Sequence, residues 1–597
     1  MCASSFVGGN PGWPGVRHRR HGVPRPAPGG RPAVCCGASG PGGHSTGGEP
    51  RGDVLGPASR VLGSREDPSM SSTTRSTAAA GEPELVLSPR TVYVIFSALL
   101  AAMFLSALDQ SVVSTALPTI VGDLRAAQHE GWIVTAYLLA IAIVMPIYGK
   151  IGDLRGRRRP FLLAVAIFVV GSTGSALSQS FTDLVVWRSV QGLGAGGLVI
   201  LSQAIIADIV SARDRGKYMG PMGAVFGVAT VAGPLLGGWF TDGPGWRWCF
   251  WLNVPIGLVA LAVAWFRLRL PSRTPSARFD LGGAVLMAAT TAGIVLFTSW
   301  SSITPEGRYD WGDPLLPGLV VLTVVALAAF LVVETKVADP LIPLRLFRSR
   351  TFSVSVTIAL LFGMTMFAAL SFLPTFLQMA RGYDATDAGL LMLPMTVGLM
   401  ITSLGSGVLI SARGRYKIYP ILGMGIATVG LALLTRLTPD ISMVTFGAMI
   451  FVLGLGLGFV MQTIVIAVQN AVAPDLVGVA TSTNNFLREI GAAVGTSVFS
   501  TVFTTNLTTR LADAVKDAPP GDVPQGFGAD SLTPELVQRL PESLREIVVD
   551  AYTDALAPAF WYLVPLGVIG FAIAFLMKEV ALSDKAGLVA RGAAVTR

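Results

Sequence analysis

The sequence predicts an all-α integral membrane protein with fourteen transmembrane helices, arranged as two six-helix bundles with two linker helices inserted between them. The composition, a recurrence of long apolar windows and an internal repeat lead to this prediction. Of the 597 residues, 52% are hydrophobic and only 13% are charged, whereas soluble domains carry about 25% charged residues. A soluble protein of this size would lack the charged surface that keeps it in solution.

Fourteen mostly apolar windows follow one another from residue 92 onward. A helix of about 20 apolar residues crosses the hydrocarbon core of a bilayer, so each window is long enough to span it. The windows cover residues 92–117, 132–149, 160–178, 184–208, 217–240, 249–267, 280–300, 314–333, 352–379, 387–410, 418–436, 441–467, 485–505 and 558–578.

These windows divide the membrane domain into an N-terminal bundle over 91–270, two inserted helices over 280–335 and a C-terminal bundle over 351–580. The C-terminal bundle includes a long extracytoplasmic loop over 506–557, and 581–597 is expected to be a cytoplasmic tail. The second half of the loop, LTPELVQRLPESLREIVVDAYTDAL, has helical spacing. It predicts an amphipathic helix or hairpin that acts as a lid, docks a partner or only packs.

The first 90 residues are rich in Gly, Pro, Arg and Ser and have no apolar period. This composition is typical of a disordered segment, expected here on the cytoplasmic side. The apolar core of a cleavable signal peptide is missing from it. The alternative is an over-extended start, with translation beginning at Met70. No function is assigned to the segment.

Lys and Arg lie in short clusters after the second, fourth, sixth, eighth and tenth windows. The clusters contain Lys150, Arg155, Arg157, Arg158 and Arg159; Arg213, Arg215 and Lys217; Arg267, Arg269, Arg273 and Arg278; Lys336, Arg345, Arg348 and Arg350; and Arg413, Arg415 and Lys417. Because cytoplasmic loops carry the excess of Lys and Arg, both termini are expected in the cytoplasm and the chain in the cell (plasma) membrane. Nucleic-acid binding is not expected from the net charge of +8, since the cations are not gathered on one soluble face.

An internal repeat relates the two bundles. GKIGDLRGRRR (149–159) is echoed by GVLISARGRYK (407–417), and GLGAG (192–196) by GLGLG (454–458), in the same order and about 260 residues apart. Parallel repeats of this kind enclose a site near the bilayer midplane and rock about it.

Several ordered motifs carry a resemblance to a known family. They are LDQSVVSTALPTI (108–120), GKIGDLRGRRRP (149–160), RSVQGLGAGG (188–197) and GPLLGG (233–238), followed by WRWCFWLNVPIG, DPLIPLRLF and LPTFLQMARGYDATDAGLLMLP. Over about residues 92–578 the chain resembles the fourteen-helix drug:proton antiporter branch of the major facilitator superfamily, the EmrB/QacA-like multidrug exporters. The resemblance implies the major facilitator fold and an antiporter. Ser114 stands where the family usually has Asn, and Ser411 replaces the Asp of the second loop signature.

Asp109 is the first candidate functional residue, because a carboxylate in an apolar helix is unfavourable without a role. Burial disfavours the charged form of an unpaired carboxyl, and a group whose charge follows its access to water suits proton coupling. Arg188 is its candidate partner and Gln191 the neighbour of Arg188 one turn on. A capping or structural role for Asp109, and an Arg188 that snorkels outward, are the alternatives. Glu489, beside Arg488, is a second acid or a charged residue flanking the interface.

The loop after the second window is a candidate inner gate. Its glycines permit a tight turn, and Asp153 can pair with a cation and accept N–H groups at the start of the third helix. Asp208 offers a second acceptor to the arginines. The resemblance implies a charge latch; a topology signal alone is the other interpretation. The latch residues would be Gly149, Asp153, Gly156, Arg157, Arg158 and Asp208.

The fifth window contains small residues at spacings of about four, which allow close helix packing, and a proline that bends the helix. Together they suit a sliding interface between the bundles, although close packing alone would explain the glycines. The residues are Gly223, Gly227, Gly233, Pro234, Gly237 and Gly238.

An enzyme is not expected. There is no phosphate-binding loop for ATP, and His129 is the only histidine of the membrane domain, which argues against a metal cluster. Together with the resemblance, the sequence predicts a proton-driven antiporter that exports amphipathic, cationic drugs or toxic compounds by alternating access. The Met, Phe and Ala side chains of LLFGMTMFAALSF (360–372) favour hydrophobic substrates. An exporter of an endogenous metabolite, siderophore or lipid, a proton-coupled nutrient symporter and a non-transporting adaptor are the alternatives. We expect a monomer in the lipid bilayer, small amphipathic molecules as partners, and the proton gradient in place of a cofactor.

Overall fold

The computed structural model describes residues 88–124, 131–270, 278–304, 312–516, 528 and 532–587. The predictions of a disordered N-terminal segment and of a start at Met70 lie outside these residues, as do His129 and the tail from 588 onward.

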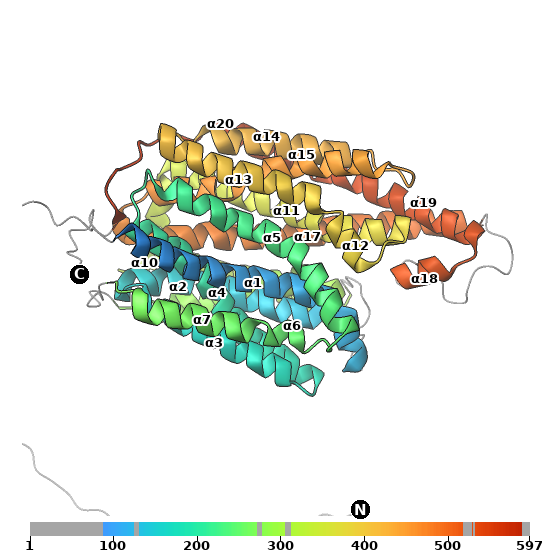
Figure 1. The fold of residues 1–597 in the computed structure, drawn as a ribbon, viewed down its shortest axis with the longest axis horizontal. Coiled ribbons are helices and arrows are strands. Elements are labelled where there is room, and N and C mark those ends of the chain that lie inside the picture. Colours follow the sequence, from blue (N-terminus) through green and yellow to red (C-terminus); the bar gives the residue numbers. More distant parts are fainter. Residues whose placement is uncertain are drawn as a thin grey trace, which may run out of the picture. The chain divides into compact units, whose positions relative to one another are not determined.

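The described residues form helices joined by short connections (Figure 1). The first half contains α1 (Pro89–Asp123), α2 (Gly131–Arg155), α3 (Arg158–Leu177), α4 (Phe181–Ile209), α5 (Arg215–Asp242), α6 (Trp248–Trp251) and α7 (Asn253–Arg267). The inserted part contains α8 (Leu281–Thr298), α9 (Trp300–Ile303) and α10 (Leu315–Lys336), followed by the 3-10 turn η2 (Leu344–Arg348). The second half contains α11 (Arg350–Arg381), α12 (Ala385–Leu390), α13 (Leu393–Arg413), α14 (Ile418–Leu434), α15 (Met443–Met461), α16 (Thr463–Asn470), η3 (Pro474–Leu476), α17 (Val477–Lys516), α18 (Pro534–Arg539), α19 (Glu542–Ala559), η5 (Phe560–Tyr562) and α20 (Val564–Phe575).

Local sequence explains where several helices begin and end. Ser180 and Asp280 precede α4 and α8, and their side chains accept the N–H groups of Asp183 and Gly283. Such caps satisfy N–H groups that have no partner within the helix. At the other end, Gly414 follows α13 with a φ of 68°, a left-handed conformation that glycine adopts without strain.

The described part of the chain contains twelve helical segments that are long and apolar enough to cross a membrane. The protein is therefore an all-helical, multi-pass membrane protein, as expected. Two of the fourteen predicted spans are not among these twelve segments. The segment over 418–436 forms α14, which is only 17 residues long. The segment over 485–505 is part of the 40-residue α17, whose many Thr, Ser and Asn side chains lower its hydropathy.

Most of the described residues in the loop predicted over 506–557 are helical. α17 continues to Lys516, and α19 begins at Glu542 and packs against α17. Phe503 meets Tyr552 with ring centroids 5.1 Å apart, and Arg510 pairs with Asp554 at 3.1 Å. Both helices extend into this predicted loop, and their polar outer faces explain why no long apolar window marks them there. The prediction of a helix in the second half of the loop is confirmed.

Helices of the first half pack mainly on one another, as do those of the second half. The most extensive contacts between the halves are those of α5 with α13 and of α2 with α17 (Figure 1). The inserted helices α8 and α10 pack together, and α8 also contacts both α2 and α17.

The ends of α2, α4 and α13 and the starts of α3, α5 and α14 carry clusters of cations; we call this end of the protein the basic end. It carries Lys150, Arg155, Arg157, Arg213, Arg215, Lys217, Arg413, Arg415 and Lys417. The chain after α20 also lies here: Asn470 Nδ2 donates to the carbonyl of Val580, and the N–H of Arg213 donates to the carbonyl of Ser583. The segment that follows the second half thus reaches the first half.

Candidate functional site

Asp109 lies in α1 and is almost fully buried, with 1% of its surface exposed. Its Oδ2 lies 2.5 Å from Nη1 of Arg188, on α4. Its Oδ1 accepts hydrogen bonds from Gln191 Nε2 and Asn253 Nδ2, each at 2.8 Å. The structure therefore brings Asp109, Arg188 and Gln191 together and adds Asn253 from α7. These four residues are the Asp109 site.

Arg188 is also 1% exposed and faces the protein interior, not the end of its helix. Its Nη1 donates to Gln191 Oε1 at 2.8 Å, and its Cζ lies 3.9 Å from the ring centroid of Tyr137. Phe250 lies near the same guanidinium, with 5.8 Å from Cζ to the ring centroid. Aromatic faces attract a cation, and they keep water from Arg188. The Arg188 charge therefore depends on Asp109 for compensation.

The local fold places each member of the Asp109 site. Arg188 and Gln191 are three residues apart on α4, so they share one helix face. The break between α6 and α7 makes Asn253 the first residue of α7. Asn253 Nδ2 also donates to Ser172 Oγ, and Ser172 Oγ donates to the carbonyl of Phe250, which fixes the amide beside Asp109.

The buried pair depends on both of its charges. Removing one partner from a buried ion pair costs about 3–5 kcal/mol because the other charge is left uncompensated. A proton on Asp109 removes the countercharge of Arg188 without removing Arg188 from its buried position. Loss of the Asp109 charge would therefore leave Arg188 buried without a countercharge in this arrangement.

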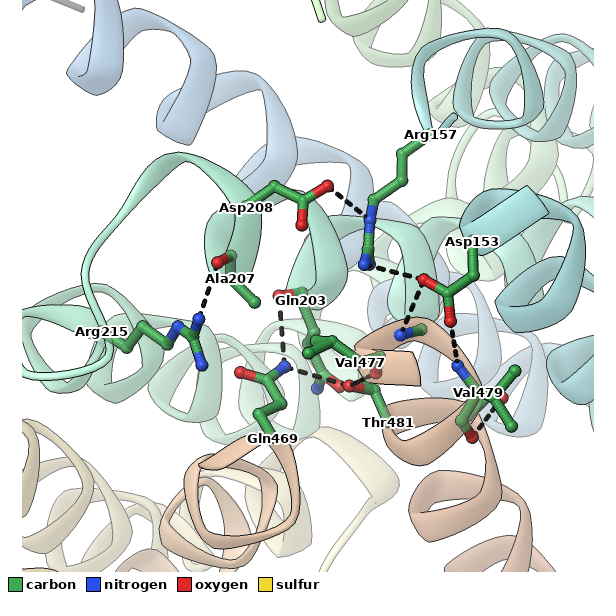
Figure 2. A network of polar contacts seen from close by, with 12 residues as sticks. Asp153, Arg157, Gln203, Ala207, Asp208, Arg215, Gln469, Val477, Val479 and Thr481 are labelled. Carbon is green, nitrogen blue, oxygen red and sulfur yellow. Dashed lines mark hydrogen bonds and ion pairs between the residues drawn. The ribbon is translucent and has the colours of Figure 1, made fainter. Parts of the chain in front are cut away.

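At the basic end, Asp153 joins the two halves (Figure 2). This α2 carboxylate accepts hydrogen bonds from the backbone N–H groups of Gly478, at 3.1 Å, and Val479, at 2.8 Å. Both residues lie at the start of α17, in the second half. Arg157 lies between two carboxylates, with Nη2 3.0 Å from Asp153 and Nε 2.7 Å from Asp208. Because α17 begins here, its N-terminal partial positive charge also favours the carboxylate.

Two expectations about this region were wrong. Asp153 was expected to accept N–H groups at the start of the third helix, but it caps α17, because α17 lies against α2 in the closed arrangement. Arg158 was expected among the latch residues, but its Nη2 donates to the carbonyl of Trp265 on α7, at 2.9 Å. Arg158 faces the outside of the first half, so Arg157 alone of the two contacts Asp208.

Gly156 and Gly149, the two glycines of the predicted latch, are each required for a different structural reason. Gly156 has a φ of 85°, which few other residues adopt without strain, and it connects α2 to α3. Gly149 lies against α17: a Cβ there would be 2.7 Å from the carbonyl oxygen of Gly478. A side chain at Gly149 would push α2 away from α17.

The α5 glycines divide between two neighbours. Gly223 and Gly227 face α13, as an interface between the halves requires. A Cβ on Gly223 would collide with Ser403, and a Cβ on Gly227 would lie 3.2 Å from Thr396. Hydrogen bonds cross the same contact, with Thr396 Oγ1 donating to the carbonyl of Gly227 at 3.3 Å.

The outer part of α5 differs from the expectation. Gly233 and Gly237 face Ser111 and Thr115 of α1, within the first half, so they pack one half and do not line the interface. Pro234 touches Gly389 of α12, and a Cβ on Gly238 would lie 2.9 Å from Thr386. Pro234 and Gly238 therefore meet the second half. The helix alternates partners because successive turns point in different directions.

Glu489 pairs with its neighbour Arg488, with 2.9 Å between Oε1 and Nη2. It was placed at the start of a helix, but α17 begins at Val477, so the pair lies three turns inside the helix. Arg488 is buried, and its Cζ lies 5.9 Å from the ring of Phe226 on α5. Its role as a second acid stays a prediction.

The sequence of this chain is similar to those of known membrane transporters. Residues 99–496 match the family described as the Major Facilitator Superfamily. The chain belongs to this superfamily. It is 39% identical over 519 residues to the MFS-type transporter Rv1877 of Mycobacterium tuberculosis, covering 87% of this chain and 74% of that protein. It is 34% identical over 398 residues to the multidrug transporter protein MdtP of Bacillus subtilis, covering 67% of this chain and 73% of that protein.

Solved structures of the superfamily have the same fold. The human organic anion transporter MFSD10 (TETRAN) matches with a TM-score of 0.54 and 15% identity, over 82% of this chain and 100% of that one. The proton:xylose symporter XylE matches with a TM-score of 0.51 and 13% identity, over 84% of this chain and 98% of that one. At these identities the likeness concerns the fold alone. A superfamily transporter is not an enzyme, in agreement with the sequence.

The structure of this superfamily member also shows polar residues that sequence reasoning missed. Asn253 is one; its signal was a single polar residue within the apolar stretch WCFWLNVPIG. A second group consists of buried amides at and beside the contact between the halves: Gln203, Gln462, Gln469, Asn484 and Asn485. A third joins the inserted helices to α2, where Lys150 Nζ donates to the carbonyl of Pro340 at 2.9 Å. Glu334 of α10 accepts the N–H groups of Leu341 and Ile342 in the same loop.

Proposed function

We propose that the chain is a proton-driven antiporter that exports amphipathic, cationic small molecules across the cytoplasmic membrane by alternating access. The observation that carries the proposal is the buried ion pair between Asp109 and Arg188, within a helical transporter fold. Relatives named as multidrug transporters support export as the direction and drugs as the substrate class.

Coupling would use the charge of Asp109. With Asp109 ionised, Arg188 is compensated and the arrangement described above is stable. When Asp109 takes up a proton from the outside, Arg188 loses its countercharge and the contacts of α1, α4 and α7 rearrange. Release of the proton on the inside restores the pair. The energy source is the proton gradient, and no cofactor is needed.

Alternating access would use the basic end, which we place in the cytoplasm together with both termini. In the described arrangement α2 and α17 are joined there by Asp153, so a substrate cannot pass between them from that side. Opening toward the cytoplasm requires Asp153 to leave the start of α17. The free energy for this step would come from the change in charge at Asp109.

We further propose that α14 and α17 also cross the bilayer, which gives the fourteen spans of the EmrB/QacA-like branch. α14 packs along α15 and α20, both parts of spanning segments. Its 17 residues give a helix of about 26 Å, close to the hydrocarbon thickness of about 30 Å. The protein acts as a monomer in this proposal.

The test is efflux of ethidium from energised cells that express the protein. The expected result is less ethidium in expressing cells than in control cells, and equal amounts once an uncoupler collapses the proton gradient. Equal accumulation before the uncoupler is added would contradict export, and lower accumulation that survives the uncoupler would contradict proton coupling.

A further inference from the structure

A group of buried side-chain amides lies at and beside the contact between the two halves, and we call it the amide cluster. Its members are Gln203 on α4, Gln462 at the break between α15 and α16, Gln469 on α16, and Asn484 and Asn485 on α17. Each of the five is nearly or completely buried. One comes from the first half and four come from the second.

Some of the amide atoms hold the halves together. Asn485 Nδ2 donates to Gln203 Oε1 at 2.9 Å, and Gln469 Nε2 donates to the carbonyl of Gln203 at 3.4 Å and to Thr481 Oγ1 at 3.1 Å. Figure 2 shows Gln469, Gln203 and Thr481 meeting close to Asp153, which caps α17. The amide cluster is therefore part of the closed contact at the basic end.

Other amide atoms have no partner. Among the described residues, the buried atoms without a hydrogen bond include Gln203 Nε2, Gln462 Nε2, Gln462 Oε1, Gln469 Oε1, Asn484 Oδ1 and Asn485 Oδ1. A contact built only to hold two halves together would pair these atoms or replace them with apolar groups, because an unpaired buried polar atom is destabilising. The unpaired atoms indicate that the same side chains bind a partner in another state.

Gln462 is the clearest case, since both atoms of its amide lack a partner. It faces the first half, because a Cβ on Gly223 of α5 would lie 2.8 Å from Gln462 Cγ. When α5 and α13 separate at the basic end, Gln462 comes to lie at the surface of the space between them.

We propose that the amide cluster lines the path by which substrate enters from the basic end, and that it selects molecules with N–H or O–H groups. This inference rests on the proposed function, in which the basic end opens to the cytoplasm. Four of the six unpaired atoms are carbonyl oxygens, which accept hydrogen bonds and carry no net charge. They add hydrogen-bond selection to a cationic, amphipathic ligand whose charge is met elsewhere.

The experiment compares two cationic probes that differ in hydrogen-bond donors. Ethidium carries two amino groups, and tetraphenylphosphonium has none. Equilibrium dissociation constants for both are measured with the purified full-length chain in lipid nanodiscs, for the wild type and for Gln462→Met, which keeps the side-chain length. Gln538→Leu, an exposed glutamine of α18, is the matched control.

We expect Gln462→Met to weaken ethidium binding about tenfold, the effect of one or two lost hydrogen bonds, and to change tetraphenylphosphonium binding less than twofold. Gln462→Met removes an unpaired amide, so its unfolding temperature should not fall. Asn484→Leu is the second variant and should show the same selectivity. Gln538→Leu should change neither constant.

Unchanged ethidium binding in both variants would overturn the inference. Equal weakening of both probes would also overturn it, since that result shows only a shift toward the closed state. If the wild type exports ethidium but the variants bind ethidium as tightly as the wild type does, the amide inference fails while the proposed function stands. If the wild type neither binds nor exports either probe, the proposed function fails together with it.

Discussion

Nη1 of Arg188 and Oδ2 of Asp109 lie 2.5 Å apart, and both side chains are excluded from solvent. Arg188, Gln191 and Asn253, which donate hydrogen bonds to Asp109, lie on α4 and α7 of the first half. The charge pair can therefore move with the first half as one unit while the halves rock. In the proposed mechanism, a proton on Asp109 would act first on contacts within the first half.

Asn253 is expected to hold the Asp109 carboxylate in place. Asn253→Leu removes one of the two donors to Oδ1, and a buried acceptor that loses a partner costs about 1–3 kcal/mol. The free energy of unfolding, measured by titration with a denaturing detergent, should fall by that amount, and proton-coupled efflux should weaken. Ser189→Ala is the control, because Ser189 Oγ bonds only to the carbonyl of Val185 on its own helix. Wild-type stability in Asn253→Leu would show that the amide has no role in the site.

Asp153→Asn is expected to loosen the basic end. The substitution removes the charge that pairs with Arg157 and weakens the acceptor for the N–H groups of Gly478 and Val479. Hydrogen–deuterium exchange at the start of α17 should become at least about tenfold faster, a change of about 1.4 kcal/mol.

Asp214→Asn is the control for this change, because Asp214 pairs with Lys217 on the exposed surface, where an ion pair contributes little. Equal exchange at residues 477–479 in wild type and Asp153→Asn would mean that the carboxylate does not hold the halves together.

The close approach of α5 and α13 is testable with two neighbouring glycines. A Cβ on Gly407 would collide with the backbone carbonyl of Gly216, whereas a Cβ on Gly405 meets nothing within 4 Å. Gly407→Val should lower the unfolding temperature by several degrees and abolish efflux, because the backbones cannot separate locally without breaking their contact. Gly405→Val should behave like the wild type. The opposite ranking of the two variants would contradict the described packing.

The fourteen-span arrangement predicts the sides of the loops that flank α14. Arg415, before α14, should be cytoplasmic, and Thr438, after it, should be outside. Single cysteines at these positions, in a chain whose four native cysteines are replaced, should be labelled by an impermeant maleimide from opposite sides of the membrane. Labelling of both from the same side would show that α14 does not cross.

Sequence reasoning found Asp109 and Arg188 because each lies within a mostly apolar helix. A charged side chain in such a helix must face the interior and pair with another group. It missed Asn253, since a neutral polar residue near a helix end is common and carries no such requirement. Asp153 was recognised as an acceptor, but its partner was wrong. Which N-terminus lies beside the end of α2 depends on how the halves pack, and one sequence does not contain that information.

The helix count and Glu489 show a second limit. The start of α17 reads VGVATSTNNF, a polar stretch whose side chains are buried between the halves. The apolar pattern starts the helix at residue 485 and therefore places Glu489 near its start, whereas the helix begins at Val477. Buried polar faces are common where helices line an internal interface, and hydropathy alone reads them as loops.

The most direct test of the account is proton movement in liposomes that contain the purified chain and are acidic inside. Addition of ethidium outside should make the lumen of wild-type liposomes less acidic, as protons leave in exchange for the dye. Asp109→Asn should show no such change while it still exchanges ethidium across the membrane without a gradient. Asp123→Asn, an exposed carboxylate of the same helix paired with Arg247, should behave like the wild type. Ethidium-dependent proton release in Asp109→Asn that equals the wild type would contradict the account.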